Sequence, residues 1–387
     1  MNETHATKYL ESLPRTEARG TTERERRLLA QMGEIPKGIL FIKILGEAGK
    51  SSASSLLASL LSGAGLRTGT VTLTPQAEPR LAIAADGKAP SHEAFAEAVT
   101  AAWNAARSLG LFDPSYEEIL LAAALRHLLG EGCRAILVSL PTDCHRSATS
   151  ALPAPRLCLL TSTGEEKARA LIPLIDTADD LVSAPQAPSV YRLLTERAAL
   201  THCRLTVPTK KDVGEAVVQN GKLCFSYRGT NVSLPTSAHY QKNNALAVIE
   251  AYRALVRQGV HLKPKHLEAA LATFKSPLGF RLFSLSPAWL IDAADTPLRL
   301  AALADSIERL PDVFGDAVTV WTEPHLADAV QATFGERISC VELLEAASLR
   351  RALKKMPPPK DSPLVIVGSK PFAAEALRAL ESYFLYS

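Results

Sequence analysis

A short turn at residues 46–52 carries the residue types that bind phosphate. Its residues are, in order, Gly46, Glu47, Ala48, Gly49, Lys50, Ser51 and Ser52. Glycines let successive backbone N–H groups point towards one anion. Lys50 would reach the outer phosphates of a nucleotide, and the hydroxyl of Ser51 or Ser52 would be available to Mg²⁺. The turn is therefore predicted to bind nucleotide phosphates.

The flanking segments place this turn between a strand and a helix. Residues 39–45 form an apolar run of strand length, and residues 53–61 carry leucines at helical spacing. The helix would direct the positive end of its dipole at the turn, which favours an anion. An ordinary strand-to-helix turn with a solvated lysine remains an alternative. Only two residues separate the glycines, where the common phosphate loop has four, and one of them, Glu47, would repel a polyphosphate.

Length, charge and cysteine content exclude several classes of protein. The chain has 387 residues, enough for two domains, and its 47% of hydrophobic residues is ordinary for a globular protein. A net charge of +3 is too small to indicate binding to nucleic acid or to an anionic membrane. No apolar stretch reaches the roughly 18 residues of a membrane span. The dispersed cysteines form no Cys-x-x-Cys pair, which argues against zinc and predicts a cytoplasmic protein; they are Cys133, Cys144, Cys158, Cys203, Cys224 and Cys340.

Strand and helix patterns alternate along the chain, which predicts an α/β protein with a mainly parallel sheet. The first series of expected strands lies at 39–45, 68–73, 135–140 and 157–160. Asn220-Gly221 then predicts a hairpin, which we expect to belong to the first domain. The second series lies at 289–292, 317–321, 338–341 and 364–367. Prolines near 276–287 punctuate the chain, so we place two domains at 1–285 and 286–387.

The order of these motifs resembles that of the folylpolyglutamate synthase/dihydrofolate synthase family, a branch of the Mur-ligase-like ATP-dependent amide ligases. The resemblance covers nearly the whole chain. The matching segments are residues 9–14, the turn at 46–52, Thr74-Pro75-Gln76, His239 with Asn243, Gly279-Phe280-Arg281 and the segment 292–297. It implies a P-loop-containing Mur-ligase-like central domain and a smaller Rossmann-like C-terminal α/β domain.

The resemblance also implies a reaction and its ligands. In the family, ATP phosphorylates a folate carboxylate, and the amine of glutamate attacks the acyl phosphate. The implied cofactors are ATP and Mg²⁺, and the implied partners are a nucleotide, a folate or similar carboxylate, and glutamate; we expect a monomer. The nucleotide would lie between the domains, in contact with Gly46, Gly49, Lys50, Ser51, Ser52, Asn243 at its base, Arg281, and Asp292 at its ribose. His239 and Asn243 would equally suit an ordinary helix N-terminus.

The chain departs from the family where Mg²⁺ would bind. By a gapless count, Ser139 stands in place of the magnesium-binding glutamate and Lys167 in place of the metal-side histidine. Ser52 and Thr74 would remain as weak hydroxyl ligands. A lysine-bearing segment is missing between residues 181 and 182, and the C-terminal His-Asn pair is replaced by Asp295 and Thr296. We therefore expect a folylpolyglutamate synthase-like pseudoenzyme with little or no catalysis.

Two alternatives remain open. If the gapless count is off, Asp143, Glu165 or Glu166 would supply the missing carboxylate, and the chain would be an active ligase that joins glutamate to a folate or similar carboxylate. A different phosphate-loop enzyme, such as a small-molecule kinase, is supported by the 46–52 turn alone. The matching C-terminal segments argue against that second alternative.

Overall fold

The computed structural model describes residues 1–15, 22–74, 76, 78–141, 148–175, 178–276, 278–285, 287–355 and 362–386. Pro75, Asp143 and Cys144 of the sequence analysis lie outside this description. Contacts divide the chain into two compact units, which are described separately: unit 1 comprises 1–213 and 243–273, and unit 2 comprises 214–242 and 274–387. The domain boundary predicted after residue 285 stays a prediction, because compact units need not coincide with domains.

Unit 1 is built on a seven-stranded sheet with the order β3-β2-β4-β1-β5-β6-β7. All neighbouring strands are parallel except β2 and β3. The strands are β1 (Leu40–Leu45), β2 (Thr68–Thr72), β3 (Ile83–Ala85), β4 (Ala135–Ser139), β5 (Leu157–Leu160), β6 (Asp180–Ser183) and β7 (Arg204–Thr206). The mainly parallel α/β sheet is confirmed, whereas the short strands β3, β6 and β7 were not predicted.

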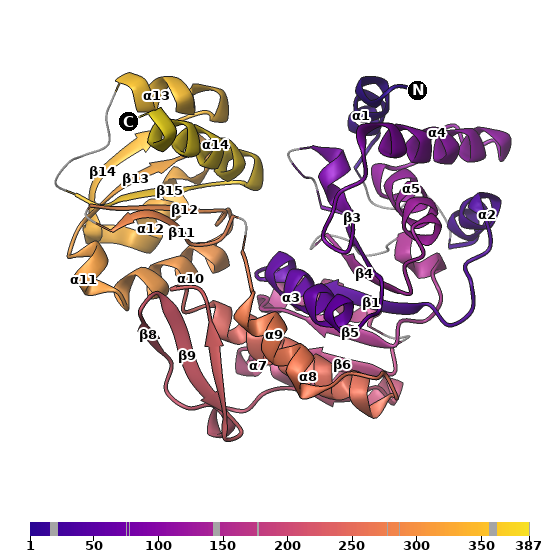
Figure 1. Ribbon diagram of the computed structural model, residues 1–387, viewed down its shortest axis with the longest axis horizontal. Helices are drawn as coiled ribbons and strands as arrows, with labels where there is room; N and C mark the ends of the chain where they lie inside the picture. Colours follow the sequence, from indigo (N-terminus) through magenta and orange to yellow (C-terminus); the bar gives the residue numbers. More distant parts are fainter. Residues whose placement is uncertain are drawn as a thin grey trace. The chain divides into compact units, whose positions relative to one another are not determined.

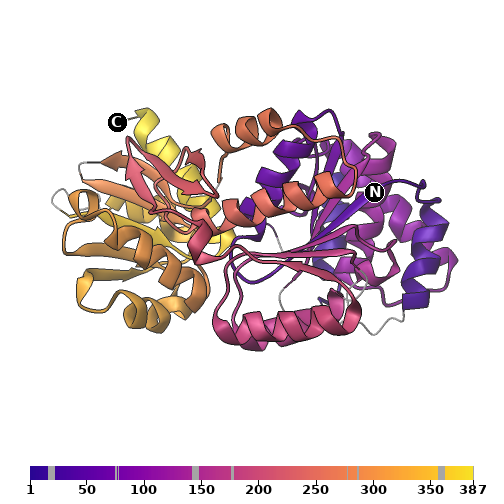
Figure 2. The ribbon, with the colours of Figure 1, turned by 90° about the horizontal axis from the view of Figure 1, so that it is seen from below.

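Nine helices belong wholly or mainly to the described part of unit 1 (Figure 1). They are α1 (Glu3–Ser12), α2 (Thr22–Met32), α3 (Lys50–Gly63), α4 (His92–Ser108), α5 (Tyr116–Gly130), α6 (Glu165–Leu171), α7 (Pro188–Thr201), α8 (Gln241–Arg257) and α9 (Pro264–Ala272). Helices α4 and α5 pack side by side, and α3 packs against β1, β2, β4 and α9. Figure 2 shows α7 and α8 on opposite faces of the sheet.

Strand β1 is buried on both faces of the sheet, which explains its unbroken apolar run. Phe41 and Leu45 join the core that contains α1, α2, α4 and α5, whereas Ile42 and Ile44 face the other side. Lys43 is also buried in this strand, and burial lowers the pKa of its ammonium. A sheet covered on both faces by helices therefore holds the strand that leads into the 46–52 turn.

Unit 2 contains a three-stranded antiparallel sheet and a five-stranded sheet with the order β11-β12-β15-β13-β14. The small sheet consists of β8 (Val217–Gln219), β9 (Lys222–Tyr227) and β10 (Thr230–Leu234). The predicted Asn220-Gly221 hairpin joins β8 and β9, with both residues at positive φ. Contacts group this hairpin with unit 2, and its expected place in the first domain stays a prediction.

The larger sheet of unit 2 is parallel except for β11, which runs antiparallel to β12. Its strands are β11 (Arg281–Leu285), β12 (Ala288–Asp292), β13 (Val318–Thr322), β14 (Ile338–Leu343) and β15 (Leu364–Val367). One face packs against α10 (Pro297–Glu308), α11 (Pro311–Phe314) and α12 (Ala327–Phe334); the other packs against α13 (Leu349–Lys355) and α14 (Lys370–Tyr386). Among the described residues, no helix is long and apolar enough to cross a membrane.

Candidate functional site

The 46–52 loop joins the end of β1 to the first turn of α3, as predicted. Gly46 and Gly49 have positive φ angles of 118° and 96°, a region that residues with side chains rarely adopt. Both are also tightly packed. A Cβ on Gly46 would lie 2.3 Å from Thr161 Oγ1, and a Cβ on Gly49 would lie 2.0 Å from Asn244 Oδ1. Conformation and space therefore both require glycine at these positions.

Lys50 is the first residue of α3, and its side chain turns back over the loop. It is only 5% exposed, and its ammonium donates a hydrogen bond to the backbone carbonyl of Gly46. A buried charge is costly unless polar atoms compensate it. Here the carbonyl of Gly46 contributes to that compensation. The loop thus holds a positive charge beside the N-terminal end of a helix, the combination that a phosphate group favours.

The residues that follow β5 hold the loop from another side. The N–H groups of Glu47 and Ala48 both donate to the carbonyl of Ser162, each at 3.0 Å. The carboxylate of Glu47 accepts a hydrogen bond of 3.4 Å from the N–H of Gly164, which is the N-cap of α6. These bonds direct the Glu47 side chain towards α6. The repulsion expected between Glu47 and a phosphate on the loop is thereby weakened.

The amide side chain beside the loop belongs to Asn244, a residue that the sequence analysis did not select. Asn244 is 4% exposed and its Oδ1 lies against Gly49, whereas Asn243 is half-buried in the same turn of α8. The helical periodicity of the sequence could have distinguished the two asparagines, because Asn244 lies on the same face of α8 as the buried Val248 and Leu255. The base contact of Asn243 stays a prediction.

The predicted hydroxyl ligands do not form a site that suits Mg²⁺. Thr74 Oγ1 lies 3.4 Å from Gln76 Nε2, and Ser52 is buried in the first turn of α3. Mg²⁺ prefers carboxylate and phosphate oxygens over neutral hydroxyls. Within the described ranges, no group of three or more His, Cys, Asp or Glu side chains could hold a metal ion.

The two positions at which the family ligands were expected offer no carboxylate. Ser139 is the last residue of β4 and is 2% exposed, and its hydroxyl has no hydrogen-bond partner among the residues described. Lys167 lies half-buried in the first turn of α6. Of the alternative donors, Glu165 is exposed and pairs with Arg169 at 2.6 Å, and Glu166 is also exposed. Among the residues that the structure describes at these positions, none offers Mg²⁺ the carboxylate and imidazole that the resemblance implies; Asp143 lies outside the description.

The point at which the family's lysine-bearing segment was predicted to be missing lies in a strand and not in a loop. Leu181 and Val182 are consecutive residues in the middle of β6, where they pair with Cys158 and Leu159 of β5. A buried strand tolerates neither an insertion nor a deletion without a change of register. An insertion at this point would interrupt β6, and the absence of the family's lysine-bearing segment here stays a prediction.

In unit 2, Asp292 ends β12 and is held by internal partners. Its Oδ2 accepts hydrogen bonds from Tyr240 Oη at 2.7 Å and from the N–H of Phe280 at 2.8 Å. Burial raises the pKa of Asp292 to about 6, although both hydrogen bonds favour the charged form. Arg281, in contrast, is exposed at the start of β11. The nucleotide contacts of Asp292 and Arg281 stay predictions.

Three further positions from the resemblance have structural partners in unit 2. Asp295 forms an ion pair with Arg299, and Thr296 is the N-cap of α10, whose hydroxyl accepts the N–H of Arg299 at 3.4 Å. His239 Nδ1 lies 3.1 Å from Asp305 Oδ2, and burial lowers the pKa of the imidazole. Each of the three residues therefore has a partner within the protein, and none of these contacts requires a bound ligand.

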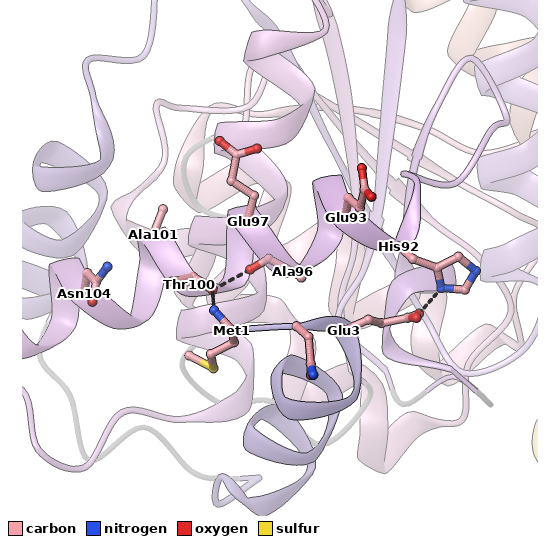
Figure 3. A pocket seen from close by; sticks show the side chains of 10 residues that line it. Met1, Glu3, His92, Glu93, Ala96, Glu97, Thr100, Ala101 and Asn104 are labelled. Atoms are coloured by element: carbon pink, nitrogen blue, oxygen red, sulfur yellow. Dashed lines mark hydrogen bonds and ion pairs between the residues drawn. The ribbon is translucent and has the colours of Figure 1, made fainter.

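A separate cavity of about 700 Å³ lies on unit 1 between α1 and α4 (Figure 3). The N-terminal amine of Met1 donates to Thr100 Oγ1 at 2.8 Å, and His92 pairs with Glu3. Figure 3 shows Glu93 and Glu97 on the α4 side of this cavity. Its lining includes none of the residues predicted to bind nucleotide or metal.

Similarity to known proteins comes from structure alone. The sequence matches no protein-family model and no curated protein. The structure of an FPGS–AMPPCP–folate complex superposes with a TM-score of 0.83 at 20% identity, covering 98% of this chain and 100% of that one. Folylpolyglutamate synthetase from Lactobacillus casei gives a TM-score of 0.79 at 20% identity, with coverages of 98% and 100%.

A third structure extends the likeness to another organism. Mycobacterium tuberculosis folylpolyglutamate synthase, complexed with ADP and AMPPCP, gives a TM-score of 0.77 at 19% identity and covers 98% of this chain and 99% of that one. Agreement over nearly the full length of both chains confirms the fold expected from the sequence resemblance. The chain has the two-part α/β fold of the folylpolyglutamate synthases.

Proposed function

We propose that this chain is a nucleotide-binding protein of the folylpolyglutamate synthase-like ligase group, with little or no ligase activity of its own. The observation that carries the proposal is the 46–52 loop. This loop has two sterically required glycines and a buried lysine at a helix N-terminus. The fold adds support, because solved structures with the same fold include complexes with ADP and AMPPCP. We expect ATP as the nucleotide and a cytoplasmic monomer as the state of the protein.

We expect little or no ligase activity because of the residues available to bind Mg²⁺ near the loop. When bound, Mg²⁺ supplies charge neutralisation to phosphoryl transfer. Ser139 and Lys167 replace the carboxylate and imidazole that the resemblance implies for that ion. Losing electrostatic stabilisation of this kind typically costs about 10²-fold or more in rate. Lys50 and the first turn of α3 would still hold and orient the phosphates.

ADP release measured with ATP, Mg²⁺, a folate and glutamate tests the proposal. We expect the purified protein to bind ATP by calorimetry and to release no ADP above the background without folate. Release of ADP at an ordinary enzyme rate, dependent on both folate and glutamate, would establish the alternative, an active ligase. Absence of ATP binding would contradict the assignment of the loop itself.

A further inference from the structure

The charges around the 46–52 loop are those of a site that neutralises phosphate without a metal. Lys50 provides an ammonium held beside the loop, and α3 adds the positive end of its dipole. Glu47 is the acidic residue within the loop, and its carboxylate is drawn towards the N–H of Gly164. Among the described residues of the loop and of the first turn of α3, the fixed charge beside a ligand is therefore positive.

Ser139 is the position at which a carboxylate would change this balance of charge at the loop. It ends β4, and in the register of the sheet it pairs with Ile44 of β1 and Thr72 of β2. Ile136, Val138 and Leu140 belong to the core on the α4 and α5 side, so Ser139 lies on the opposite face of β4. Helix α3 packs against β4, β1 and β2.

The hydroxyl of Ser139 is a second, independent sign of a ligand position. It is buried, and among the described residues it has no hydrogen-bond partner. A buried hydroxyl without a partner is less favourable than one that makes a hydrogen bond. A hydroxyl can accept or donate a hydrogen bond to a phosphate oxygen or to water, but it is a weak ligand for Mg²⁺ because it carries no charge.

We propose that the 46–52 loop binds the polyphosphate of a nucleotide without a divalent cation, and that Ser139 sets this preference. Lys50 and the N-terminal turn of α3 supply the countercharge that Mg²⁺ would otherwise provide. Free ATP carries more negative charge than its magnesium complex, so it interacts more strongly with this fixed positive charge. The inference rests on the proposed nucleotide binding and adds the ionic form of the ligand.

Calorimetric titration of ATP into the wild-type protein, in EDTA and in excess MgCl₂, tests the inference directly. We expect the dissociation constant in EDTA to be equal to or lower than that in MgCl₂. An affinity that rises about tenfold or more with MgCl₂, equivalent to about 1.4 kcal/mol, would overturn the inference while leaving nucleotide binding intact. No binding in either arm would overturn both the inference and the proposed function.

Two variants test the assignment to Ser139. Ser139→Glu and the smaller Ser139→Asp introduce a carboxylate at this position, and we expect at least one to bind ATP about tenfold more tightly in MgCl₂ than in EDTA. Ser108→Asp, which adds the same charge at an exposed position of α4, is the matched control and should show no magnesium dependence. If both folded carboxylate variants bind ATP equally in the two buffers, Ser139 does not set the metal preference.

Tripolyphosphate identifies the part of the ligand that the site recognises. In EDTA, it should compete with ATP if the phosphates provide most of the affinity. Failure of tripolyphosphate to compete would show that binding comes from the nucleoside, which contradicts a charge-based preference.

Discussion

Polar residues lie at the C-terminal ends of two parallel strands, β1 of unit 1 and β12 of unit 2, but their contacts differ. After β1, the 46–52 loop holds Lys50 beside the N-terminus of α3, and tight packing fixes both of its glycines. After β12, Asp292 receives hydrogen bonds from Tyr240 and Phe280. At the first position a buried ammonium lies beside the N-terminus of a helix, the arrangement that we propose binds phosphate, whereas at the second the carboxylate accepts two hydrogen bonds from within unit 2. A shared α/β topology therefore does not imply equivalent sites.

Replacement of Gly49 should have the largest effect. A Cβ would lie 2.0 Å from Asn244 Oδ1 at a φ of +96°, so Gly49→Ala combines backbone strain with a steric clash. We expect a loss of about 3 kcal/mol in the free energy of unfolding, measured by urea denaturation. ATP affinity should fall with it.

Gly65→Ala provides the control for this prediction. Gly65 also has a positive φ, of +86°, but nothing lies within 4 Å of its Cβ position. It should lose only about 1 kcal/mol through backbone strain. Equal losses for Gly49→Ala and Gly65→Ala would show that packing against Asn244 is unimportant.

Removal of the Asp292 carboxylate should destabilise unit 2. Asp292→Ala leaves the buried Tyr240 hydroxyl and the Phe280 N–H without their acceptor. The expected cost is about 3 kcal/mol, since each orphaned donor costs about 1–3 kcal/mol. Amide exchange of residues 281–292 should rise in parallel. Unchanged exchange and stability would mean that Asp292 is not primarily an internal acceptor, and would strengthen its predicted nucleotide role.

The pKa of Asp292 adds a pH dependence. Because its folded-state pKa is raised to about 6, the folded protein resists ionisation that the unfolded chain undergoes near pH 4. Its contribution to stability is therefore greatest below about pH 4 and is lost as pH rises to about 6. Asp292→Asn should remove this dependence, whereas Asp316→Asn at an exposed position should keep it.

Glu25 provides a comparison in which a buried acid faces another acid. Glu25 is buried in α2, and burial followed by repulsion from Glu118 raises its pKa to about 7, against the opposing effect of Arg24. Its stabilising contribution should be complete below about pH 4.5 and lost as pH rises to about 7. Glu25→Gln should therefore stabilise the protein by about 2 kcal/mol at pH 8, and less at pH 5.

Thermal unfolding at pH 5 and pH 8 measures this difference. Glu23→Gln is the matched control, because Glu23 is exposed on the same helix and pairs with Arg26. It should leave the pH dependence unchanged. A Glu25→Gln variant that retains the wild-type pH dependence would contradict the role of Glu25.

The smallest effect is expected at Thr296. Thr296→Ala removes the hydroxyl that caps α10 and should cost about 1 kcal/mol in unfolding free energy. Thr296→Ser retains the hydroxyl and should restore most of this loss. If alanine and serine behave alike, the cap contributes little and the residue remains available for another role.

The 46–52 loop could be predicted from sequence because its signals are local: an apolar strand, glycines, a lysine and a leucine-rich helix follow one another. Asn244 and Tyr240 could not be placed in the same way. Their partners Gly49 and Asp292 are distant in sequence, and tertiary packing decides which side chain of α8 or its preceding turn reaches them.

Counting along the sequence had a different weakness. The family's lysine-bearing segment was predicted to be missing between Leu181 and Val182, a point that lies inside a strand of only four residues with no periodic signal. The gapless count reached Ser139, which the structure places at the end of β4, one of the predicted strands; its match to the family's magnesium-binding glutamate stays a prediction. Strand ends that are bounded by apolar runs can be predicted, whereas short strands between irregular segments need the structure.

The most direct test of the central claim is calorimetric titration of ATP in EDTA into wild type, Lys50→Ala and Lys37→Ala. Lys37 is an exposed lysine before β1 and controls for the loss of one positive charge. Loss of the charge-assisted contacts of Lys50 should weaken binding at least about tenfold, while Lys37→Ala should match wild type. Equal ATP affinity in Lys50→Ala and wild type would contradict the claim that the 46–52 loop binds the phosphates.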